Sequence, residues 1–408
     1  MRVELLTVGS ELVSGATVNT NAAYLARRLA EAGLPCARQT AVGDELNGLR
    51  AALREILARS QLVLLTGGLG PTFDDVTLEA VAEIAGRPLV RHAATQARVR
   101  RFYTRRHRRL QQAALRQAAL PRGAEALPNP IGTAPGVWLR LPATLVIALP
   151  GVPGEMRAIM EQSVLPRLRR LPDRLPSATL TLRTIGVVEL SIEAILRRLR
   201  LPSGIDIGLY PSLRMVDVRL TATGPGAARA VKRIAAALRR RLGLAVYGVD
   251  GQTLSEAVGR LLLRRGATLA VAESCTGGLL TDHLTDTPGS SRYLLGSVVA
   301  YANAVKSGCL GVPKETLARH GAVSPQTASR MARGVRRLLR ADVGVAITGI
   351  AGPSGGTAKK PVGLAYVAVA DPRGALVRRY QFFGDRAAVK MQAAQAAMDA
   401  LRRRLLER

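Results

Sequence analysis

Short apolar runs alternate along this chain with longer segments in which apolar residues recur every three or four positions. The runs predict strands and the longer segments predict helices. Among the first 170 residues the predicted strands are Val3 to Ser10, Pro35 to Val42, Leu62 to Leu65 and Leu145 to Leu149, and the helices are Tyr24 to Leu29 and Leu46 to Arg59. Strands that alternate with helices imply right-handed crossovers and a parallel sheet.

Residues 171–250 follow a different order. Leu171 to Ser177 is rich in proline and charge, which is typical of a linker. Beyond it the pattern predicts strand, helix, two strands, helix and strand, which is a split βαβ arrangement, with the first helix beginning at Glu189. The segment has no cluster of His, Cys or paired carboxylates, so we interpret it as a small α+β packing domain.

The remaining residues return to an alternation of helix and strand. Thr253 to Arg265 is an amphipathic helix, Ala267 to Glu273 is a strand, and Val343 to Ile347 is another strand. At 408 residues the chain is too long for one ordinary domain. The predicted fold class is therefore α/β in three parts: a parallel-sheet domain at residues 1–170, the α+β domain at 171–250 and an α/β domain at 251–408.

Composition narrows the class of protein. Apolar residues make up 48% of the chain but aromatic residues only 3%, so the core should consist of Leu, Val, Ile and Ala. No run approaches the length that crosses a bilayer, and the first residues lack a signal-peptide pattern, so we expect a cytoplasmic protein without membrane contact. Cys36, Cys275 and Cys309 have neither the number nor the spacing of a disulfide framework or a zinc site.

The formal charge of +30 is carried mostly by arginine. A charge of that size attracts nucleic acids and other polyanions. The clusters, however, lie in helical segments beside leucines, as solvated helix faces do, and aromatic residues do not interleave them. We therefore expect no specific nucleic-acid partner, while phosphorylated small substrates would benefit from the same field. The clusters are Arg98 to Arg109, Arg197 to Arg200, Arg239 to Arg241 and Arg402 to Arg404.

A glycine-rich stretch, Thr66 to Thr77, stands at the carboxyl end of the strand Leu62 to Leu65. Ligands of open parallel sheets bind at this edge, and glycines let backbone amides approach a phosphate there. The residues expected to face a phosphate are Gly67, Gly68, Gly70 and Thr72.

Carboxylates accompany those glycines. Asp74 and Asp75 are adjacent, so that they can hold a hard divalent cation beside the phosphate, and Glu155 adds a third carboxylate at the same rim after the strand Leu145 to Leu149. The alternative is a glycine-rich turn capped by an aspartate, which accounts less well for the density of glycines, threonines and paired aspartates.

A second stretch, Ala272 to Gly278, follows an apolar run and precedes a helical spacing, which predicts strand, tight turn and helix start. The turn places Ser274, Cys275 and Thr276 beside the free N–H groups of a helix N-terminus. Two interpretations are open. The turn can hold a nucleophile and its oxyanion, or Ser274 or Thr276 can simply cap the helix. The local sequence alone favours the cap.

Two downstream segments reverse that preference. Val298 to Lys306 places the phenol of Tyr301 and the amine of Lys306 five residues apart, with Asn303 between them. The strand that ends at Ile347 runs into Thr348 to Gly356, a second glycine-rich loop suited to a phosphate or ribose. The alternative for the first segment is an ordinary strand end with a solvated lysine.

Serine becomes a nucleophile when a base takes its proton. The histidines of this domain, His283 and His320, stand in no hydrolase motif. A lysine can act as the base if burial or a neighbouring cation lowers its pKa, and a tyrosine can relay the proton. Ser274, Lys306 and Tyr301 would then form a Ser-Lys amidase centre.

Backbone N–H groups near Thr276 and Gly277 would supply the oxyanion hole of that centre. Cys275 is a competing nucleophile. It is the weaker choice because its side chain points away from that of Ser274 on the turn and no histidine partner lowers its pKa.

The first domain resembles the molybdopterin-binding-like (MoCF-like) domain at the front of the CinA family of competence/damage-inducible proteins. The matching stretches are Gly9 to Leu12, Asn19 to Ala26, Thr66 to Thr77, Gly132 to Gly136 and Gly151 to Met156. The resemblance implies metal-dependent hydrolysis of ADP-ribose, with Asp44, Asp75 and Glu155 near a divalent metal such as Mg²⁺ and the diphosphate.

One segment departs from that resemblance. Shortly before the residues that match Gln117 and Ala118 the family usually has a pair of asparagines and then basic residues, whereas this chain has Ala113, Ala114 and Leu115 and keeps only Arg116. The resemblance implies that this loop faces the nucleotide. Alanines cannot hydrogen-bond a nucleotide, so the departure predicts a weakened or lost front-domain activity.

The last domain resembles the CinA C-terminal domain, the nicotinamide-nucleotide amidase family. The matching stretches are Ala272 to Gly278, Tyr301 to Lys306, Gly321 to Ser324 and Thr348 to Pro353. The resemblance implies hydrolysis of nicotinamide mononucleotide to nicotinate mononucleotide and ammonia without a cofactor, by a homodimer, as salvage in the pyridine nucleotide cycle.

By matched position, the resemblance implies Ser274 as the nucleophile, with Lys306 and Tyr301 assisting. The residues implied at the nucleotide are Thr276, Gly277, Asn303, Thr348, Gly349 and Gly352. Gly384 to Arg386 also matches, although Lys390 stands where arginine is usual, which replaces a bidentate fork with a point charge.

Two rival interpretations remain. The basic charge and the family's competence name suggest a nonenzymatic nucleotide sensor or a DNA-associated accessory protein. The front domain could alternatively handle molybdopterin during cofactor assembly.

Overall fold

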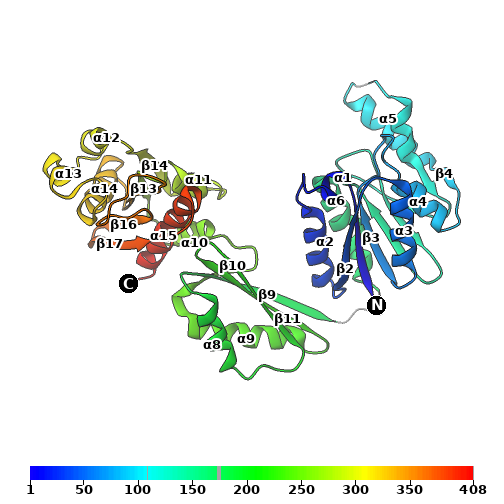
Figure 1. Ribbon diagram of the computed structural model, residues 1–408, viewed down its shortest axis with the longest axis horizontal. Helices are drawn as coiled ribbons and strands as arrows, with labels where there is room; N and C mark the ends of the chain where they lie inside the picture. Colours follow the sequence, from blue (N-terminus) through cyan, green and yellow to red (C-terminus); the bar gives the residue numbers. More distant parts are fainter. Residues whose placement is uncertain (108, 172–175, 408) are drawn as a thin grey trace. The chain divides into compact units, whose positions relative to one another are not determined.

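The computed structural model describes residues 1–107, 109–171 and 176–407, and it divides into two compact units (Figure 1). One unit comprises Met1–Thr179 with Ala222–Ala228, and the other comprises Leu180–Thr221 with Arg229–Arg408. Most of the middle segment therefore belongs with the C-terminal domain. The predicted linker falls largely on residues 172–175, which lie outside the described residues.

Strands and helices alternate in the first unit, as the apolar pattern predicts. Its strands are β1 Val3–Val8, β2 Cys36–Val42, β3 Leu62–Thr66, β4 Leu89–Arg91, β5 Ala119–Pro121, β6 Glu125–Leu127, β7 Gly136–Arg140 and β8 Leu145–Leu149. Its helices are α1 Ser10–Val13, α2 Thr20–Glu31, α3 Leu46–Leu57, α4 Thr77–Ile84, α5 Ala93–Arg105, η1 Gln112–Ala118, α6 Pro153–Ile159, η2 Met160–Val164 and α7 Leu165–Leu168.

A six-stranded sheet in the order β2-β1-β3-β8-β7-β6 forms the centre of this unit. β2, β1, β3 and β8 run parallel, as predicted, whereas β7 and β6 are antiparallel additions that the pattern does not predict. The chain leaves β1 for β2 on one side and returns to β3 on the other side. The loops that follow β1 and β3 therefore run in opposite directions from the carboxyl edge of the sheet. Open sheets bind ligands at such a point.

Both faces of this sheet are covered because successive strand residues point to opposite sides. Leu5 and Leu64 pack with apolar residues of α2 and α6, whereas Leu6 and Val63 pack with apolar residues of α3 and α4. Figure 1 shows these two pairs of helices on opposite sides of the blue strands. The continuous burial of β1, β3 and β8 follows from this double cover.

The middle segment has the predicted order of elements. They are β9 Ser177–Ile185, α8 Glu189–Arg197, β10 Ile205–Ser212, β11 Met215–Thr223, α9 Ala227–Leu242, η3 Gly243–Ala245 and β12 Val246–Val249. The sheet order is β10-β11-β9-β12, and α8 begins at Glu189 as expected. In Figure 1, α8 and α9 lie on the same side of this sheet.

The C-terminal domain also alternates between strands and helices. Its strands are β13 Leu269–Glu273, β14 Leu294–Val299, β15 Val343–Gly349, β16 Leu364–Asp371 and β17 Gly374–Gln381. Its helices are α10 Leu254–Arg265, α11 Leu279–Thr285, η4 Ser290–Arg292, α12 Asn303–Gly308, α13 Lys314–His320, α14 Pro325–Leu338 and α15 Arg386–Leu406.

Its sheet has the order β14-β13-β15-β16-β17, in which the first three strands are parallel and the last two antiparallel. The chain passes from β13 to β14 on one side and then crosses to β15 on the other side of β13. β13 therefore lies at the point where the strand order reverses, and a ligand crevice is expected at its carboxyl end.

The two faces of this second sheet differ in side-chain size. Val271 and Val345 pack with α10, α11 and α15, whereas Ala272 and Ala346 face α14. A Cβ atom on Gly344 would lie 2.2 Å from the carbonyl oxygen of Ala332 in α14. Small residues on this face therefore let α14 approach the sheet closely.

The α/β fold class with parallel-containing sheets is confirmed. Within the described residues, no helix combines the length and the apolar character that crossing a membrane requires.

Candidate active site

The carboxyl ends of three parallel strands bring the predicted residues of the C-terminal domain to one edge. Glu273, the last residue of β13, is level with Val299 at the end of β14 and with Ile347 near the end of β15. The segments that carry Ser274, Tyr301 and Thr348 therefore leave the sheet side by side. The structure thus brings together segments as far apart in the sequence as Ser274 and Thr348.

Ser274 stands at the start of the turn after β13 with its hydroxyl uncommitted. Its amide donates to the carbonyl of Ile347 at 3.0 Å, which ties the turn to β15. Ser274 is 8% exposed, and among the described residues no group hydrogen-bonds its Oγ. The hydroxyl is held in place by its backbone and is free to meet a substrate.

Glu273 caps the helix that follows this turn. Its carboxylate accepts hydrogen bonds from the amides of Gly278, Leu280 and Thr281 at 3.0, 3.1 and 2.9 Å, and from the Thr281 hydroxyl at 2.6 Å. The interpretation of Ser274 or Thr276 as the helix cap is therefore wrong. The sequence pattern gives no signal for this role of Glu273, because a strand residue that caps the next helix is recognised only from the fold.

The free N–H groups lie in the turn itself. The amide of Gly277 donates to the carbonyl of Ser274 at 3.2 Å, so it is not free as an oxyanion donor. Within the described residues, the amide of Thr276 has no acceptor, the amide of Cys275 meets only its own thiol, and Thr276 Oγ1 is buried without a partner. The donors expected near Thr276 and Gly277 are therefore those of Cys275 and Thr276.

Lys306 is a buried amine held by two carbonyl groups. It is 1% exposed, and its Nζ donates to the carbonyl oxygens of Ala300 at 2.7 Å and Tyr301 at 2.8 Å. Burial lowers the pKa of Lys306 because the charged form loses hydration. Two of its N–H bonds are committed, so one tetrahedral position remains for a lone pair that can take a proton. The structure shows no direct hydrogen bond between Lys306 Nζ and Ser274 Oγ.

Tyr301 contributes its carbonyl to Lys306 and its side chain to another partner. The side chain is 62% exposed, and its hydroxyl accepts a hydrogen bond from Arg386 Nη2 at 3.1 Å. Arg386 Nη1 also donates to the carbonyl of Gly352 at 2.7 Å. Arg386 therefore links the end of β14 to the loop after β15, while the phenol is not hydrogen-bonded to Ser274 or Lys306.

The remaining predicted nucleotide residues surround these groups. Thr348 is buried and donates its hydroxyl to the carbonyl of Ala322 at 2.7 Å, whereas Asn303 is exposed at the start of α12. Gly349 ends β15, and Gly352 has a positive φ of 81° in the following loop. Lys390 Nζ lies 3.9 Å from the position of a Cβ on Gly277, so a cation stands beside the turn.

Cys275 is unsuited to be the nucleophile. Its side chain is buried, and burial raises the pKa of the thiol to about 11. The thiolate, which is the reactive form, is therefore scarce at neutral pH. The cysteines of the chain, Cys36, Cys275 and Cys309, are free, in agreement with the absence of a predicted disulfide framework.

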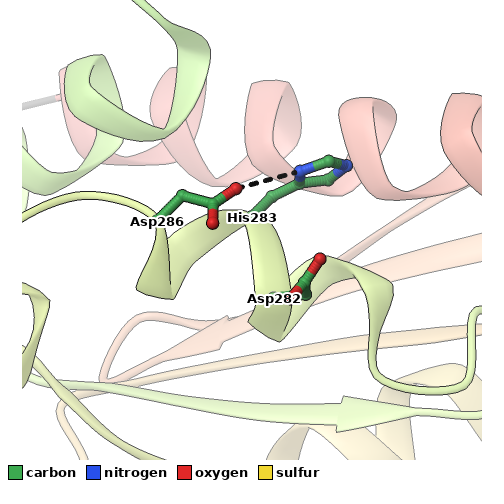
Figure 2. Close-up of side chains that lie close together, drawn as sticks. All are labelled: Asp282, His283 and Asp286. Atoms are coloured by element: carbon green, nitrogen blue, oxygen red, sulfur yellow. Dashed lines mark ion pairs between the residues drawn. The ribbon is translucent and has the colours of Figure 1, made fainter. Parts of the chain in front are cut away.

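A cluster on α11 has the residue types of a metal site. Asp282, His283 and Asp286 are the group of this kind found among the described residues, with ligand atoms within 4.8 Å of one another. Figure 2 shows that Asp286 faces the His283 ring, at 3.8 Å from Nδ1, while Asp282 comes from another side of the helix. His283 Nε2 faces Met391 Sδ at 3.3 Å. Since both aspartates are exposed, we interpret the cluster as a helix surface with an ion pair.

The first unit has a comparable edge at the carboxyl ends of β1, β3 and β8. A Cβ on Gly67 would lie 2.0 Å from the carbonyl oxygen of Val8, and one on Gly68 would lie 2.3 Å from Thr77 Oγ1. Both glycines have positive φ. These two glycines therefore permit close packing of the loops, whatever they also offer to a phosphate.

The three predicted metal ligands of this unit each accept a hydrogen bond from a different protein group. Asp44 accepts from the amide of Ser10 at 2.8 Å, Asp75 accepts from the amide of Thr72 at 2.8 Å, and Glu155 accepts from Asn129 Nδ2 at 2.6 Å. No metal-type group of the described residues unites Asp44, Asp75 and Glu155. As they stand, the three carboxylates do not fit a single ion.

A cavity of about 200 Å³ opens beside Asp75. We call it the front cavity, and its polar lining comes from Gly68, Gly70, Asp75, Glu79, Arg116 and Gln117. Arg116 donates to the carbonyl of Thr72 at 3.0 Å and to Glu79 Oε1 at 3.1 Å, so it ties the glycine-rich loop to α4. The resemblance implies that the segment before Gln117 faces the nucleotide, but it assigns no site role to Arg116 or Gln117; their contacts with the glycine-rich loop and the cavity come from the fold.

Three family models match successive parts of the chain. The models are described as "Probable molybdopterin binding domain" for residues 4–170, "Damage-inducible protein CinA KH domain" for residues 179–248 and "CinA C-terminal domain" for residues 251–405. The residue pattern at 179–248 does not by itself predict a KH module.

Full-length relatives carry the same names. A CinA-like protein of Geobacter metallireducens is 44% identical over 411 residues, which cover 100% of each chain. A CinA-like protein of Gloeobacter violaceus is 43% identical over 410 residues, which cover 99% of this chain and 96% of the relative. A crystal structure of CinA from Thermoplasma acidophilum is 37% identical over 39% of this chain and 94% of that chain, with a TM-score of 0.37.

Proposed function

The chain belongs to the CinA family, and on that premise we propose that its C-terminal domain hydrolyses the carboxamide of nicotinamide mononucleotide to nicotinate mononucleotide and ammonia. The observation that carries the proposal is Lys306. An amine that is 1% exposed, with a pKa lowered by burial and two hydrogens bound to carbonyls, is suited to be a general base. The uncommitted hydroxyl of Ser274 lies at the same edge of the sheet.

The first half of the reaction makes an ester on Ser274. Neutral Lys306 Nζ takes the hydroxyl proton as Ser274 Oγ bonds to the carboxamide carbon, and the carbonyl electrons move onto the oxygen. The amides of Cys275 and Thr276 are the available donors for that oxyanion. The C–N bond then breaks, and the proton on Lys306 passes to the departing nitrogen, which leaves as ammonia.

The second half returns the enzyme to its starting state. A water molecule attacks the ester carbon while Lys306 takes one of its protons. The bond to Ser274 Oγ then breaks, Oγ regains the proton from Lys306, and nicotinate mononucleotide leaves. The sum is one substrate and one water converted to one acid and one ammonia, without a cofactor.

Cationic groups support a phosphorylated substrate at this edge. Lys390 lies beside Gly277, and Arg386 lies between Tyr301 and Gly352. We assign the phosphate of the substrate to this cationic side of the site. The exposed phenol of Tyr301 is then available to cover the pyridine ring or to relay a proton.

Ammonia release from nicotinamide mononucleotide tests the proposal. Ser274→Ala should abolish it, with a loss of at least about 10³-fold, because the covalent route is removed. Cys275→Ala keeps the backbone amide and should retain most of the activity. Absence of ammonia release by the wild type across the pH range would overturn the amidase proposal and favour a nonenzymatic nucleotide sensor.

For the front domain, the proposed ligand is ADP-ribose, whose diphosphate would face the glycine-rich loop and Arg116. The front cavity favours this second function, because it joins that loop to a cation and a polar amide. A divalent metal would supply Lewis-acid assistance to diphosphate hydrolysis, but the three carboxylates do not fit one ion as arranged, so no step is assigned to it. Retained hydrolysis of ADP-ribose would argue against a molybdopterin-handling role.

The KH match raises nucleic-acid binding as an alternative for the middle segment. KH modules clamp a nucleic-acid backbone with a Gly-x-x-Gly loop. Residues 179–248 contain no Gly-x-x-Gly sequence. The expectation of no specific nucleic-acid partner stays a prediction, which titration with single-stranded RNA and DNA at physiological salt would test.

A further inference from the structure

Gln117 is a deeply buried side chain whose amide oxygen has no partner. It is 5% exposed, and its Oε1 is a buried acceptor without a hydrogen bond from any of the described residues. Leaving a buried polar group unpaired is unfavourable, so native proteins rarely keep one without a reason. A ligand that pairs with the amide would remove this cost.

The surroundings of Gln117 indicate where such a ligand would bind. Gln117 lines the front cavity together with Gly68, Gly70 and Arg116. Gly68 and Gly70 contribute backbone to the lining, beside the carboxylates of Asp75 and Glu79. Arg116, the neighbouring residue, lines the same space, with its guanidinium bonded to the carbonyl of Thr72 and to Glu79. One cavity thus contains a neutral amide for a heterocycle, and a cation with a glycine-rich loop for phosphate.

The rest of η1 does not compete for this role. Ala114 is buried and apolar, and Ala113 is exposed. The polar side chains of η1 that line the cavity are those of Arg116 and Gln117. The departure from the family pattern at Ala113, Ala114 and Leu115 therefore leaves ligand recognition by this segment to Arg116 and Gln117.

We propose that the unpaired amide of Gln117 recognises the amino-bearing edge of a purine, so that the front cavity takes an adenine nucleotide with its base at Gln117 and its phosphate toward Arg116 and the glycine-rich loop. A carboxamide accepts from the 6-amino group with its oxygen and donates to a neighbouring ring nitrogen with its NH₂ group. This inference rests on the proposed ADP-ribose site and names the group that recognises the base.

A cycle of one substitution and one ligand change tests this contact. Full-length wild type and Gln117→Leu are titrated calorimetrically with AMP and with purine riboside 5′-monophosphate, which lacks the 6-amino group. We expect the wild type to bind AMP about tenfold more tightly than its analogue, and Gln117→Leu to bind the two equally. An equal preference for AMP in both proteins would overturn the inference, as would a failure of the wild type to bind AMP.

Thermal unfolding without ligand provides a second readout. Leucine fills a similar volume and removes the unpaired amide. Gln117→Leu should therefore raise the midpoint temperature at which the unit that contains it unfolds. Gln112→Leu, on the exposed part of the same element, is the matched control and should change neither the midpoint nor AMP affinity. A lowered midpoint in Gln117→Leu would indicate a structural role for the amide and contradict the inference.

These measurements are independent of turnover. If ADP-ribose is not hydrolysed but the AMP cycle shows the expected coupling, the diphosphatase proposal fails and the base contact stands. If 6-hydroxymethylpterin binds with the same dependence on Gln117 and AMP does not bind, the adenine assignment is wrong and the molybdopterin-handling role is favoured.

Discussion

The candidate sites of the two units use the same part of an α/β sheet in different ways. Each lies at the carboxyl ends of parallel strands where the strand order reverses, and each has a turn with glycines of positive φ. In the C-terminal domain the uncommitted groups are the hydroxyl of Ser274, one position on Lys306 and two backbone amides. In the front domain the three carboxylates already accept hydrogen bonds from the protein, and the amide oxygen of Gln117 is one of the buried atoms that have no partner among the described residues.

This difference separates chemistry from recognition. A hydroxyl, an amine and N–H donors can exchange protons and stabilise charge, whereas a carboxamide can only form hydrogen bonds. In the C-terminal site, two backbone carbonyls accept hydrogen bonds from Lys306, and no carboxylate of the described residues forms an ion pair with it. We therefore expect the C-terminal domain to carry the faster reaction and the front domain to act chiefly by binding its nucleotide.

Among the predictions that test this difference between the two sites, removal of the buried amine should have the largest effect. Lys306→Met keeps an unbranched chain of similar length but lacks the base, so amidase turnover should fall by about 10²–10⁴-fold. Lys360→Met is the matched control, because Lys360 Nζ also donates to a carbonyl, that of His320, outside the proposed chemistry. Lys306→Met with turnover within tenfold of the wild type would remove Lys306 as the base.

The pH dependence of the amidase examines the same amine without a substitution. Only neutral Lys306 can take a proton, and burial lowers its pKa below the ordinary value, so kcat/KM should rise with pH through that lowered pKa. Because protonation of the buried amine is unfavourable, the neutral form of Lys306 contributes to the free energy of unfolding. This contribution is fully present above the pKa of the unfolded state and is lost as pH falls through the pKa of the folded state. An acidic limb of the rate profile that persists in Lys306→Met would assign it to another group.

Substitution of Asp75 tests whether the front domain performs chemistry at all. If the carboxylates come together on a divalent ion, ADP-ribose hydrolysis should need Mg²⁺, stop with a chelator and fall about 100-fold in Asp75→Ala. Asp74→Ala, which changes the exposed neighbouring carboxylate, is the control. Rapid hydrolysis that survives chelation would contradict the division between chemistry and recognition.

Glu273→Gln would sharpen the account of the C-terminal turn. Its side-chain NH₂ would face amide donors that now meet carboxylate oxygens, so we expect a loss of about 2 kcal/mol in stability and about tenfold in amidase kcat. Thr281→Ala removes only the hydroxyl donor and should cost less. Chemical denaturation and initial rates measure the two effects, and an unchanged kcat would show that the cap does not position Ser274.

Arg386→Lys should give the smallest effect. Lysine cannot reach both the hydroxyl of Tyr301 and the carbonyl of Gly352 with a planar fork, so the two loops would lose one link. We expect KM for nicotinamide mononucleotide to rise about two- to fivefold with little change in kcat. A fall in kcat alone would instead indicate that the phenol takes part in proton transfer.

Much of the fold follows from the order of the apolar residues. The runs at β1, β3, β8 and β13 and the helices α3 and α10 are visible in the sequence because each buries a continuous run or one helical face. The antiparallel strands β6 and β7 were not predicted, because β6 has only three residues, at Glu125–Leu127. The side of a sheet on which each strand pairs is also absent from any local pattern.

The candidate sites were predictable only where a motif stands in one stretch of chain. Ser274, Tyr301 and Lys306 reach one edge because their strands are neighbours, as the motif order suggests. The role of Glu273 as a cap, the bridge made by Arg386 and the unpaired amide of Gln117 depend on contacts between distant residues. For the carboxylates of the front domain the sequence predicts neighbouring positions on one rim of the sheet, but it does not predict that they fail to share one ion.

The burial of Cys275 has a consequence for chemical resistance. Oxidants and alkylating reagents attack thiolates that solvent can reach, and Cys275 offers neither exposure nor a lowered pKa. Cys309 is exposed and would react first. The amidase should therefore keep its activity under oxidising conditions and after treatment with iodoacetamide. A thiol beside a nucleophile would then have no part in controlling the enzyme.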